Sequence, residues 1–427
     1  MNEYFNQNRR EFLKRISILA GSSIAVTTMP WLKVFADSKS FGKSAADKVR
    51  LGIIGIGDRG SALLLNVKSF MNSLNVDIAA ICDNYEPNFH RALERTEGKA
   101  EGFRDYRKLL EIKDLDGIII ATPLNEHAHI TIDALNSGLH VFCEKAMARS
   151  IEDVKLMYDT HIKADRILQI GLQRMFNPVY LEGIEKIHKG ELGQITQMRA
   201  YWHRNNNWRR PVPDNNPELE KKINWRLYDN ASAGLLTELA SHQIQIANWV
   251  KNSEPVSVMG TGSINYWKDG REVFDNIACI FSYADGTQFI YDSVSSNKHY
   301  GLEEQIMGHK GTIEFEINKM YSESPPNPPA ILRLVNDIEK GIFDTIPIGG
   351  ASWITETASQ YNGEYISNNY KMDETKLQLE AFVKYIRKGR APEILTMHGY
   401  HSSLWCLLAE NAIKQGSVIK LPIGYSI

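Results

Sequence analysis

Apolar runs that alternate with helical patterns fill the chain between residues 49 and 172. Each run is short and lacks polar–apolar alternation, which is typical of parallel strands covered on both faces. The stretches between them space apolar residues as amphipathic helices do, and Ser150 with Asp153 forms a capping signal before one of them. This alternation predicts a doubly wound parallel sheet in an α/β protein. The expected strands are 49–54, 76–82, 117–123, 140–143 and 167–171.

The pattern changes in the second half of the chain, where short strands follow one another with no helix between them. Turns such as Lys268-Asp269-Gly270 suit hairpins, so these strands predict a meander with one face free for association. A stretch rich in Pro, Asn, Ser and Gly at 321–372 predicts long loops, and amphipathic helices are expected at 374–388 and 398–414. The expected strands are 256–266, 273–283, 287–295, 304–307 and 312–315.

A glycine-rich turn, Gly55-Ile56-Gly57-Asp58-Arg59-Gly60, joins the first strand to the first helix. This spacing is typical of a dinucleotide site, although such turns also occur with nothing bound. One glycine permits the tight turn, the next lets the backbone approach a pyrophosphate, and the third lets the helix pack on the strand. The second strand ends in Asp83, where a carboxylate can accept from a ribose 2′-OH and would repel a 2′-phosphate. We therefore expect NAD rather than NADP.

The first 36 residues have the pattern of an export signal. Asn8-Arg9-Arg10-Glu11-Phe12-Leu13-Lys14 precedes a weakly apolar run at 16–28, and Val34-Phe35-Ala36 stands where a signal peptidase would cut. The segment resembles a twin-arginine signal. A membrane helix is the alternative, but the run is well short of about 20 apolar residues. We expect a periplasmic protein, cleaved near Ala36 or retaining its signal, with no stable membrane insertion after cleavage and a linker at 37–48.

Composition limits the classes of function. With 427 residues, of which 43% are hydrophobic and 23% charged, the chain is long enough for two or three globular domains. The net charge is −2, or −5 without residues 1–36, so the chain offers no general field for nucleic acid and we expect no nucleic-acid partner. The four cysteines form no C-x-x-C pair, which argues against a disulfide framework or zinc site; we expect no metal.

Five segments resemble the Gfo/Idh/MocA family of nucleotide-dependent sugar oxidoreductases; in order they are GIIGIGDRG, AICD, IIATPLNEHA, GLHVFCEK and IGLQRMFNP. They are in register between residues 52 and 178, and a later Gly-x-x-x-Glu-x-x-x-His segment ending at His242 adds a sixth. The resemblance implies a Rossmann domain at 49–172. It also implies an α/β domain at 173–427 with a large, open, mostly antiparallel sheet, in a homodimer or homotetramer.

Two segments carry the candidate catalytic residues. Lys145 follows a strand at the edge where ligands bind in doubly wound folds, and the resemblance implies that its amine positions and polarises the reacting hydroxyl. Here Ala146 replaces the proline of the family's Glu-Lys-Pro, and a surface ion pair with Glu144 is the alternative. Glu238 and His242 are i and i+4 on a helix, so the carboxylate can orient the imidazole. The resemblance makes His242 the general base, with Glu238 replacing the usual Asp.

The other candidate residues surround the same crevice. The segments 203–210 and 225–228, before the catalytic helix, concentrate aromatic rings, amides and guanidinium groups. This composition suits a sugar, which stacks its C–H faces on aromatics; rings buried at an oligomer interface are the alternative. Gln245 stands where relatives have a substrate-contacting Asp, and Arg174 could instead pair with an acid between the domains. The cofactor set is Gly55, Gly57, Asp58, Arg59, Gly60, Asp83, Thr122, Pro123, Asn125, His127, Glu144, Lys145, Gln173 and Arg174. The substrate set is Arg174, Trp208, Arg209, Trp225, Arg226, Tyr228, His242 and Gln245.

An exported NAD enzyme meets no free NAD pool, so we expect a tightly held cofactor that is restored at the same site. The leading hypothesis is hydride transfer between bound nicotinamide and a ring hydroxyl of a sugar or glycoside, with C3 the favoured carbon. The first alternative is a redox-neutral glycoside hydrolase or lyase, because a 3-keto group acidifies the C2 proton and permits loss of the C1 substituent. The second is a non-catalytic carbohydrate-binding module; the presence of Lys145, Glu238 and His242 disfavours it.

Overall fold

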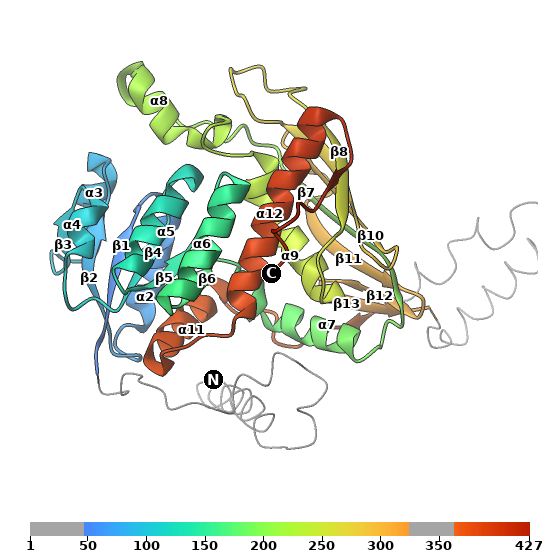
Figure 1. The fold of residues 1–427 in the computed structure, drawn as a ribbon, viewed down its shortest axis with the longest axis horizontal. Helices are drawn as coiled ribbons and strands as arrows, with labels where there is room; N and C mark the ends of the chain where they lie inside the picture. Colours follow the sequence, from blue (N-terminus) through green and yellow to red (C-terminus); the bar gives the residue numbers. More distant parts are fainter. Residues whose placement is uncertain (1–46, 324–362) are drawn as a thin grey trace, which may run out of the picture.

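The computed structural model describes residues 47–323 and 363–427, and Figure 1 shows two sheets with helices packed between them. The expected signal at 1–36, most of the linker at 37–48 and most of the loops at 321–372 lie outside the described residues. Among the helices that are described, none is both long and apolar enough to cross a lipid bilayer.

The N-terminal sheet has six parallel strands in the order β3-β2-β1-β4-β5-β6, which confirms the predicted doubly wound Rossmann architecture. Helices α2, α3 and α11 (Glu374–Lys388) cover one face, and α4, α5 and α6 cover the other. The strands are β1 (Val49–Ile54), β2 (Val76–Cys82), β3 (Glu101–Phe103), β4 (Gly117–Ile120), β5 (His140–Cys143) and β6 (Leu168–Ile170). The helices are α2 (Asp58–Phe70), α3 (Glu86–Arg95), α4 (Tyr106–Leu110), α5 (His127–Asn136) and α6 (Ile151–Ala164).

Local signals set several boundaries in this domain. The Ser150 Oγ accepts from the N–H of Asp153 at 3.1 Å, so α6 begins at the predicted cap. The third predicted strand is shorter than 117–123, because β4 ends at Ile120 and the chain then forms a 3₁₀ turn at Leu124–Glu126. The shortening places the residues after β4 at the edge where ligands bind.

The C-terminal sheet has nine strands in the order β14-β13-β12-β11-β7-β10-β9-β8-β15. All neighbours are antiparallel except β7 and β10, which confirms the expected mostly antiparallel sheet. The strands are β7 (Ile195–His203), β8 (Ser257–Ser263), β9 (Asn276–Ser282), β10 (Gln288–Val294), β11 (Leu302–Gly308), β12 (Gly311–Glu314), β13 (Lys319–Ser322), β14 (Glu364–Tyr365) and β15 (Ile419–Lys420).

The predicted meander is wrong at one point. Strand β7 was not predicted from the sequence, and it lies between β10 and β11, which therefore do not pair. Along β7 the side chains alternate, so Met198, Ala200 and Trp202 share one face. Pairing over a separation of about 90 residues depends on tertiary packing, which local turn signals do not report.

The chain returns to the Rossmann domain near its end. Helix α11 (Glu374–Lys388) places Leu379, Phe382 and Val383 in the core that contains β1 and α2. Helix α12 (Ile394–Gln415) packs against α6, α9 and β8 and runs between the two sheets in Figure 1. The predicted domains, 49–172 and 173–427, do not anticipate that α11 packs in the core of the first domain. The remaining helices are α7 (Pro178–His188), α8 (Pro217–Ile223) and α9 (Ser241–Lys251).

Candidate active site

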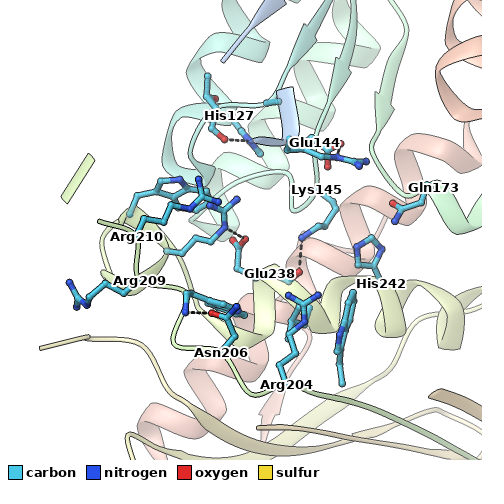
Figure 2. Close-up of a pocket in the computed structure, with 18 residues that line it drawn as sticks. His127, Glu144, Lys145, Gln173, Arg204, Asn206, Arg209, Arg210, Glu238 and His242 are labelled. Carbon is cyan, nitrogen blue, oxygen red and sulfur yellow. Dashed lines mark hydrogen bonds and ion pairs between the residues drawn. The ribbon is translucent and has the colours of Figure 1, made fainter. Parts of the chain in front are cut away.

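A cavity of about 500 Å³ opens between the two domains, beyond the carboxyl ends of β4, β5 and β6. Ligands bind at this edge in doubly wound folds. Figure 2 shows side chains of both domains converging on the cavity. Among the predicted site residues, those that line it are Arg59, Thr122, His127, Glu144, Lys145, Gln173, Trp208, Arg209, Trp225, Arg226, Glu238 and His242.

The glycine turn is shaped for a close ligand at one position only. Gly55 has a φ of +84°, and a Cβ at Gly60 would lie 1.8 Å from the Gly55 carbonyl oxygen, so both positions require glycine. A Cβ at Gly57 would meet nothing nearer than 3.9 Å. Gly57 immediately precedes α2, whose first N–H groups favour an anion. The turn therefore fits the pyrophosphate of a dinucleotide beside Gly57.

Alanine variants of these glycines should separate folding from cofactor binding. Gly60→Ala should destabilise the fold, because its Cβ would overlap backbone. Gly57→Ala should leave the melting temperature unchanged or slightly higher, while weakening NAD binding at least about 10-fold, since the methyl group fills the approach to the pyrophosphate. Calorimetry of both variants checks this. Wild-type NAD affinity in a folded Gly57→Ala protein would contradict the proposed cradle.

Asp83 fixes the glycine turn as well as ending β2. Its carboxylate accepts from the N–H of Ile56 at 2.7 Å and from the N–H of Tyr85 at 2.8 Å. The side chain is 8% exposed. Because a carboxylate offers about four lone-pair sites, acceptor capacity remains for a ribose hydroxyl. Selection of NAD by Asp83 stays a prediction.

Lys145 projects into the cavity from the segment after β5 (Figure 2). Its Nζ donates to the Glu238 carbonyl oxygen at 2.7 Å and lies 3.4 Å from that of Thr237. Burial lowers the pKa of Lys145, and the charges of Glu238 and Glu144 oppose this shift. The Lys145–Ala146 peptide bond is cis. Since an ammonium group has three protons, one remains for a ligand.

The neighbours of this lysine are held by contacts of their own. Glu144 pairs with Arg59 of the glycine turn, with 2.7 Å between Oε1 and Nε, so the alternative surface ion pair with the lysine is not formed. His127 lies between the carbonyl oxygens of Thr122 and Ala146, at 3.0 and 2.9 Å. Burial lowers the pKa of His127. The imidazole thus ties the segments after β4 and β5 together.

His242 lies in α9 on the opposite wall of the cavity and is 4% exposed. Its ring centroid is 5.9 Å from that of Trp202. Burial lowers the pKa of His242 well below its ordinary value, and the positive charges of Arg174, Lys145 and Arg59 lower it further. The imidazole is therefore neutral at physiological pH and can accept a proton.

The predicted contact between Glu238 and His242 is wrong. Glu238 lies in a π-helical turn, Leu236–Ala240, and its carboxylate accepts from Arg226 Nε at 2.8 Å. A guanidinium gives a charge-assisted hydrogen bond that a neutral imidazole does not match. Burial opposes ionisation of Glu238, but Arg226 and Lys145 hold its pKa below the ordinary value. Glu238 therefore positions Arg226 by its side chain and Lys145 by its carbonyl.

Three buried polar atoms of the cavity wall lack a hydrogen-bond partner within 47–323 and 363–427: Thr122 Oγ1, Gln173 Oε1 and His242 Nδ1. Buried polar atoms are nearly always paired in native proteins, so these three mark where a ligand completes the site. Thr122 and Gln173 follow β4 and β6 of the Rossmann domain, and their contacts with the cofactor stay predictions. His242 belongs to the C-terminal domain, where the substrate is expected.

Three predicted substrate residues do not reach the cavity. Arg174 is 5% exposed and pairs with Glu316 at 2.7 Å, which agrees with the alternative of a structural ion pair. Gln245 is fully buried in α9, and the Tyr228 hydroxyl donates to Glu220 at 2.9 Å. The predicted substrate contacts of these residues are corrected, because ion pairing, a hydrogen bond or burial in the helix keeps each of them out of the cavity lining.

The remaining cofactor candidates lie beside the cavity. Asp58, at the start of α2, pairs with Arg210 at 2.6 Å. Pro123 precedes the 3₁₀ turn after β4, and the exposed Asn125 lies within that turn. Their contacts with NAD stay predictions.

Several residues of the wall were not among the predicted site residues: Trp202, Arg204, Asn206 and Arg210. Composition alone marked the segment 203–210 as a substrate loop. The missed signal is the period-two pattern of β7, which places Trp202 on the face of Met198 and Ala200.

Two family profiles match the chain in succession. One, described as "Oxidoreductase family, NAD-binding Rossmann fold", matches residues 49–172, and the other, "GFO/IDH/MocA C-terminal domain", matches residues 180–314. The chain belongs to the Gfo/Idh/MocA family. Its Rossmann domain is thus the family's NAD-binding domain, in agreement with the cradle at Gly57.

Two similar proteins differ in how much of their length and of this chain the similarity covers. Myo-inositol 2-dehydrogenase of Thermotoga maritima is 22% identical over 377 residues, which cover 87% of this chain and 98% of that protein. A glycosyl hydrolase family 109 protein of Shewanella baltica is 29% identical over 244 residues, 52% of this chain and 50% of that protein.

Solved structures show the same fold. Levoglucosan dehydrogenase in complex with NADH and levoglucosan has a TM-score of 0.68 and 19% identity, covering 88% of this chain and 100% of its own. The WlbA dehydrogenase of Bordetella pertussis, in complex with NADH and UDP-GlcNAcA, has a TM-score of 0.67 and 19% identity over the same shares of the two chains.

Proposed function

We propose that this Gfo/Idh/MocA protein transfers a hydride between tightly bound NAD and a ring hydroxyl of a sugar or glycoside, with C3 the favoured carbon. The observation that carries the proposal is that Lys145 and His242, from different domains, line one cavity beyond the strand ends (Figure 2). The names of relatives, myo-inositol 2-dehydrogenase and levoglucosan dehydrogenase, support a cyclic sugar or polyol as substrate.

The chain's own groups supply the proton chemistry. When bound, NAD supplies the acceptor or donor of the hydride. Lys145, held by the Glu238 carbonyl, donates a hydrogen bond to the reacting oxygen and stabilises negative charge there. His242, which is neutral because of burial, takes the hydroxyl proton as the alcohol is oxidised and returns it in the reverse direction.

Two contacts that cross between the domains support a retained cofactor. Arg210 pairs with Asp58 beside the glycine turn, and Lys222 of α8 donates to the Asn84 carbonyl at 2.9 Å, next to Asp83. In doubly wound folds the pyrophosphate and ribose of a dinucleotide lie by the glycine turn and the end of the second strand, so bound NAD would lie close to both contacts. In Figure 1, α8 projects from the C-terminal domain toward the Rossmann domain. The contacts would have to break before NAD leaves over this edge.

A redox-neutral glycoside hydrolase or lyase, acting through a 3-keto intermediate, is the second candidate. The similarity to proteins named glycosyl hydrolase family 109 favours it, although this chain spans only half of the cited one. Retained NAD fits it equally, because the hydride returns to the sugar. The buried, neutral His242 and the buried Lys145 on one cavity disfavour a module that only binds carbohydrate.

The test begins with residues 37–427, purified through extensive dialysis and then denatured to quantify the released NAD(H) by chromatography. Near-stoichiometric release supports retention, and absence of NAD(H) with binding restored by added NAD indicates an exchangeable cofactor. Glycosides are then supplied without added NAD. A ketosugar formed with a single reduction of NAD supports the dehydrogenase, and unoxidised sugar released over many turnovers supports the hydrolase. Binding without any turnover would contradict both.

We further propose that the segment 1–36 is a twin-arginine signal that exports the folded protein with NAD bound. The arginine pair at Arg9 and Arg10, the apolar run and the residues before Ala36 support this. N-terminal sequencing of periplasmic material checks both export and cleavage. Protein found only in the cytoplasm would contradict the proposal.

We also propose a homodimer or homotetramer formed through the second sheet. The register places Met259, Ile280 and Ile290 side by side on β8, β9 and β10, on the face opposite the buried residues of these strands. Met259 is 50% exposed. Among the described elements, the helices lie on the other face of this sheet (Figure 1). Light scattering of the purified protein gives the mass that decides the assembly.

A further inference from the structure

Within the part of the chain that the structure describes, one arginine of the cavity has no carboxylate partner. Five arginines line it, and the other four each form an ion pair. For Arg204, no carboxylate partner occurs among residues 47–323 and 363–427. A guanidinium that has no carboxylate partner can offer its N–H donors to a bound anion. The four ion pairs are Arg59–Glu144, Arg209–Glu220, Arg210–Asp58 and Arg226–Glu238.

Arg204 is exposed, and an aromatic ring rather than an acid is the neighbour of its guanidinium. Its guanidinium carbon lies 5.1 Å from the centroid of the Trp202 ring, and its backbone N–H donates to the Val294 carbonyl at 2.8 Å. A cation–π contact orients the guanidinium without neutralising it. The Trp202 ring is also 5.9 Å from the His242 ring, so Arg204 and the proposed base both neighbour one indole.

The loop after β7 adds an aromatic surface to the same region. Trp208 lines the cavity with a φ of +60°, a left-handed conformation that is costly for a residue with a side chain. The Asn206 side chain accepts from the Trp208 N–H at 2.6 Å, and Arg271 donates to the Asn207 carbonyl at 2.7 Å. These contacts hold the backbone around Trp208, and Trp208 and Arg204 both line the cavity.

We propose that Arg204 binds an anionic group on the substrate, so that the enzyme acts on acidic sugars, either uronates or sulfated sugars. The inference rests on the proposed function, in which the reacting hydroxyl meets Lys145 and His242. The sugar's C–H face would pack on Trp208 and its anion would meet Arg204. The pyrophosphate of NAD is not this anion, because it belongs beside Gly57, and Figure 2 shows Arg204 near His242 and away from Arg210.

The test uses the NAD-loaded full chain and matched p-nitrophenyl glycosides: glucuronide with glucoside, galacturonide with galactoside, and the 6-sulfate of the galactoside. For at least one ring stereochemistry, the acidic member should have a kcat/KM about 10- to 100-fold above that of the neutral one, taken from the concentration dependence of single-turnover NAD reduction or of p-nitrophenol release. Arg204→Gln should abolish this ratio mainly by raising KM. Arg199→Gln, an exposed arginine on the other face of β7, should preserve it.

The outcomes separate this inference from the function on which it rests. Equal kcat/KM for acidic and neutral members would overturn the role of Arg204 and leave the proposed oxidoreductase intact. An acidic preference that survives in a folded Arg204→Gln variant with normal NAD content would overturn it as well. Failure of every glycoside to bind or turn over would overturn the proposed function itself. A higher kcat/KM for the sulfate than for the galacturonide would identify sulfated sugars as the substrates.

Discussion

His242→Asn is expected to lower kcat by about 100- to 10,000-fold while NAD and sugar stay bound, because asparagine removes the group that takes the hydroxyl proton. The matched control is His129→Asn, an exposed histidine of α5 that interacts with Glu126. The rate of reduction of the bound NAD in a single turnover, with measured NAD content, checks the prediction. A folded His242→Asn protein that keeps wild-type kcat would contradict the role of this residue as the base.

The lowered pKa of His242 should also be visible in the pH dependence of the wild-type protein. Burial holds the pKa of His242 below its ordinary value, so the imidazole remains a base as the pH falls past about 6.5. The acid limb of kcat/KM assigned to His242 is therefore expected below that pH. In the unfolded chain, His242 takes up a proton at a pH where the folded, buried His242 does not. This difference makes the free energy of unfolding decrease as the pH is lowered through that range. In the His242→Asn variant, the free energy of unfolding should therefore fall less steeply as the pH is lowered.

Lys145→Met is expected to lower kcat by about 100- to 1,000-fold, the usual effect of removing one donor to a developing oxyanion. The substitution removes the amine held by the Glu238 carbonyl, and it leaves that carbonyl without this donor. KM should change much less than kcat, because the lost hydrogen bond strengthens as charge develops on the oxygen. Presteady-state measurement of NAD reduction by bound substrate reports the chemical step.

The control for this prediction is Lys155→Met, on α6, where the side chain pairs with Asp159 at 2.5 Å. Thermal unfolding of both variants separates loss of chemistry from loss of fold. A Lys145→Met protein that is stable, loaded with NAD and as fast as wild type would show that the reacting oxygen is stabilised elsewhere.

Features that depend on neighbouring residues were predictable from the sequence. The glycine turn was recognised because tight backbone approach requires glycine at Gly55 and Gly60, and the structure shows both requirements. Five of the six strands of the Rossmann sheet and the cap at Ser150 are local in the same sense, whereas the short edge strand β3 was not predicted. Lys145 and His242 were found through their motifs, and both line the cavity.

Features that depend on which side chains meet were not predictable in this way. Helical spacing put Glu238 and His242 on one face, but it could not show that Arg226, 12 residues earlier, would supply a stronger partner. The motif placed Arg174 at the crevice, whereas a buried Glu304 and the nearby Glu316 draw it inward. Gln245 was misplaced because its burial within α9 is a property of the assembled domain, which spacing along the chain does not specify.

The sequence by itself determined the family, the nucleotide-binding turn and the two residues proposed for catalysis, because each is encoded in a short stretch of chain. Only the tertiary structure decided how distant stretches combine. It inserted β7 between β10 and β11, and it returned α11 to the Rossmann core. It also neutralised four arginines of the cavity while leaving Arg204 beside Trp202, because ion pairing depends on distances in space that spacing along the chain does not specify.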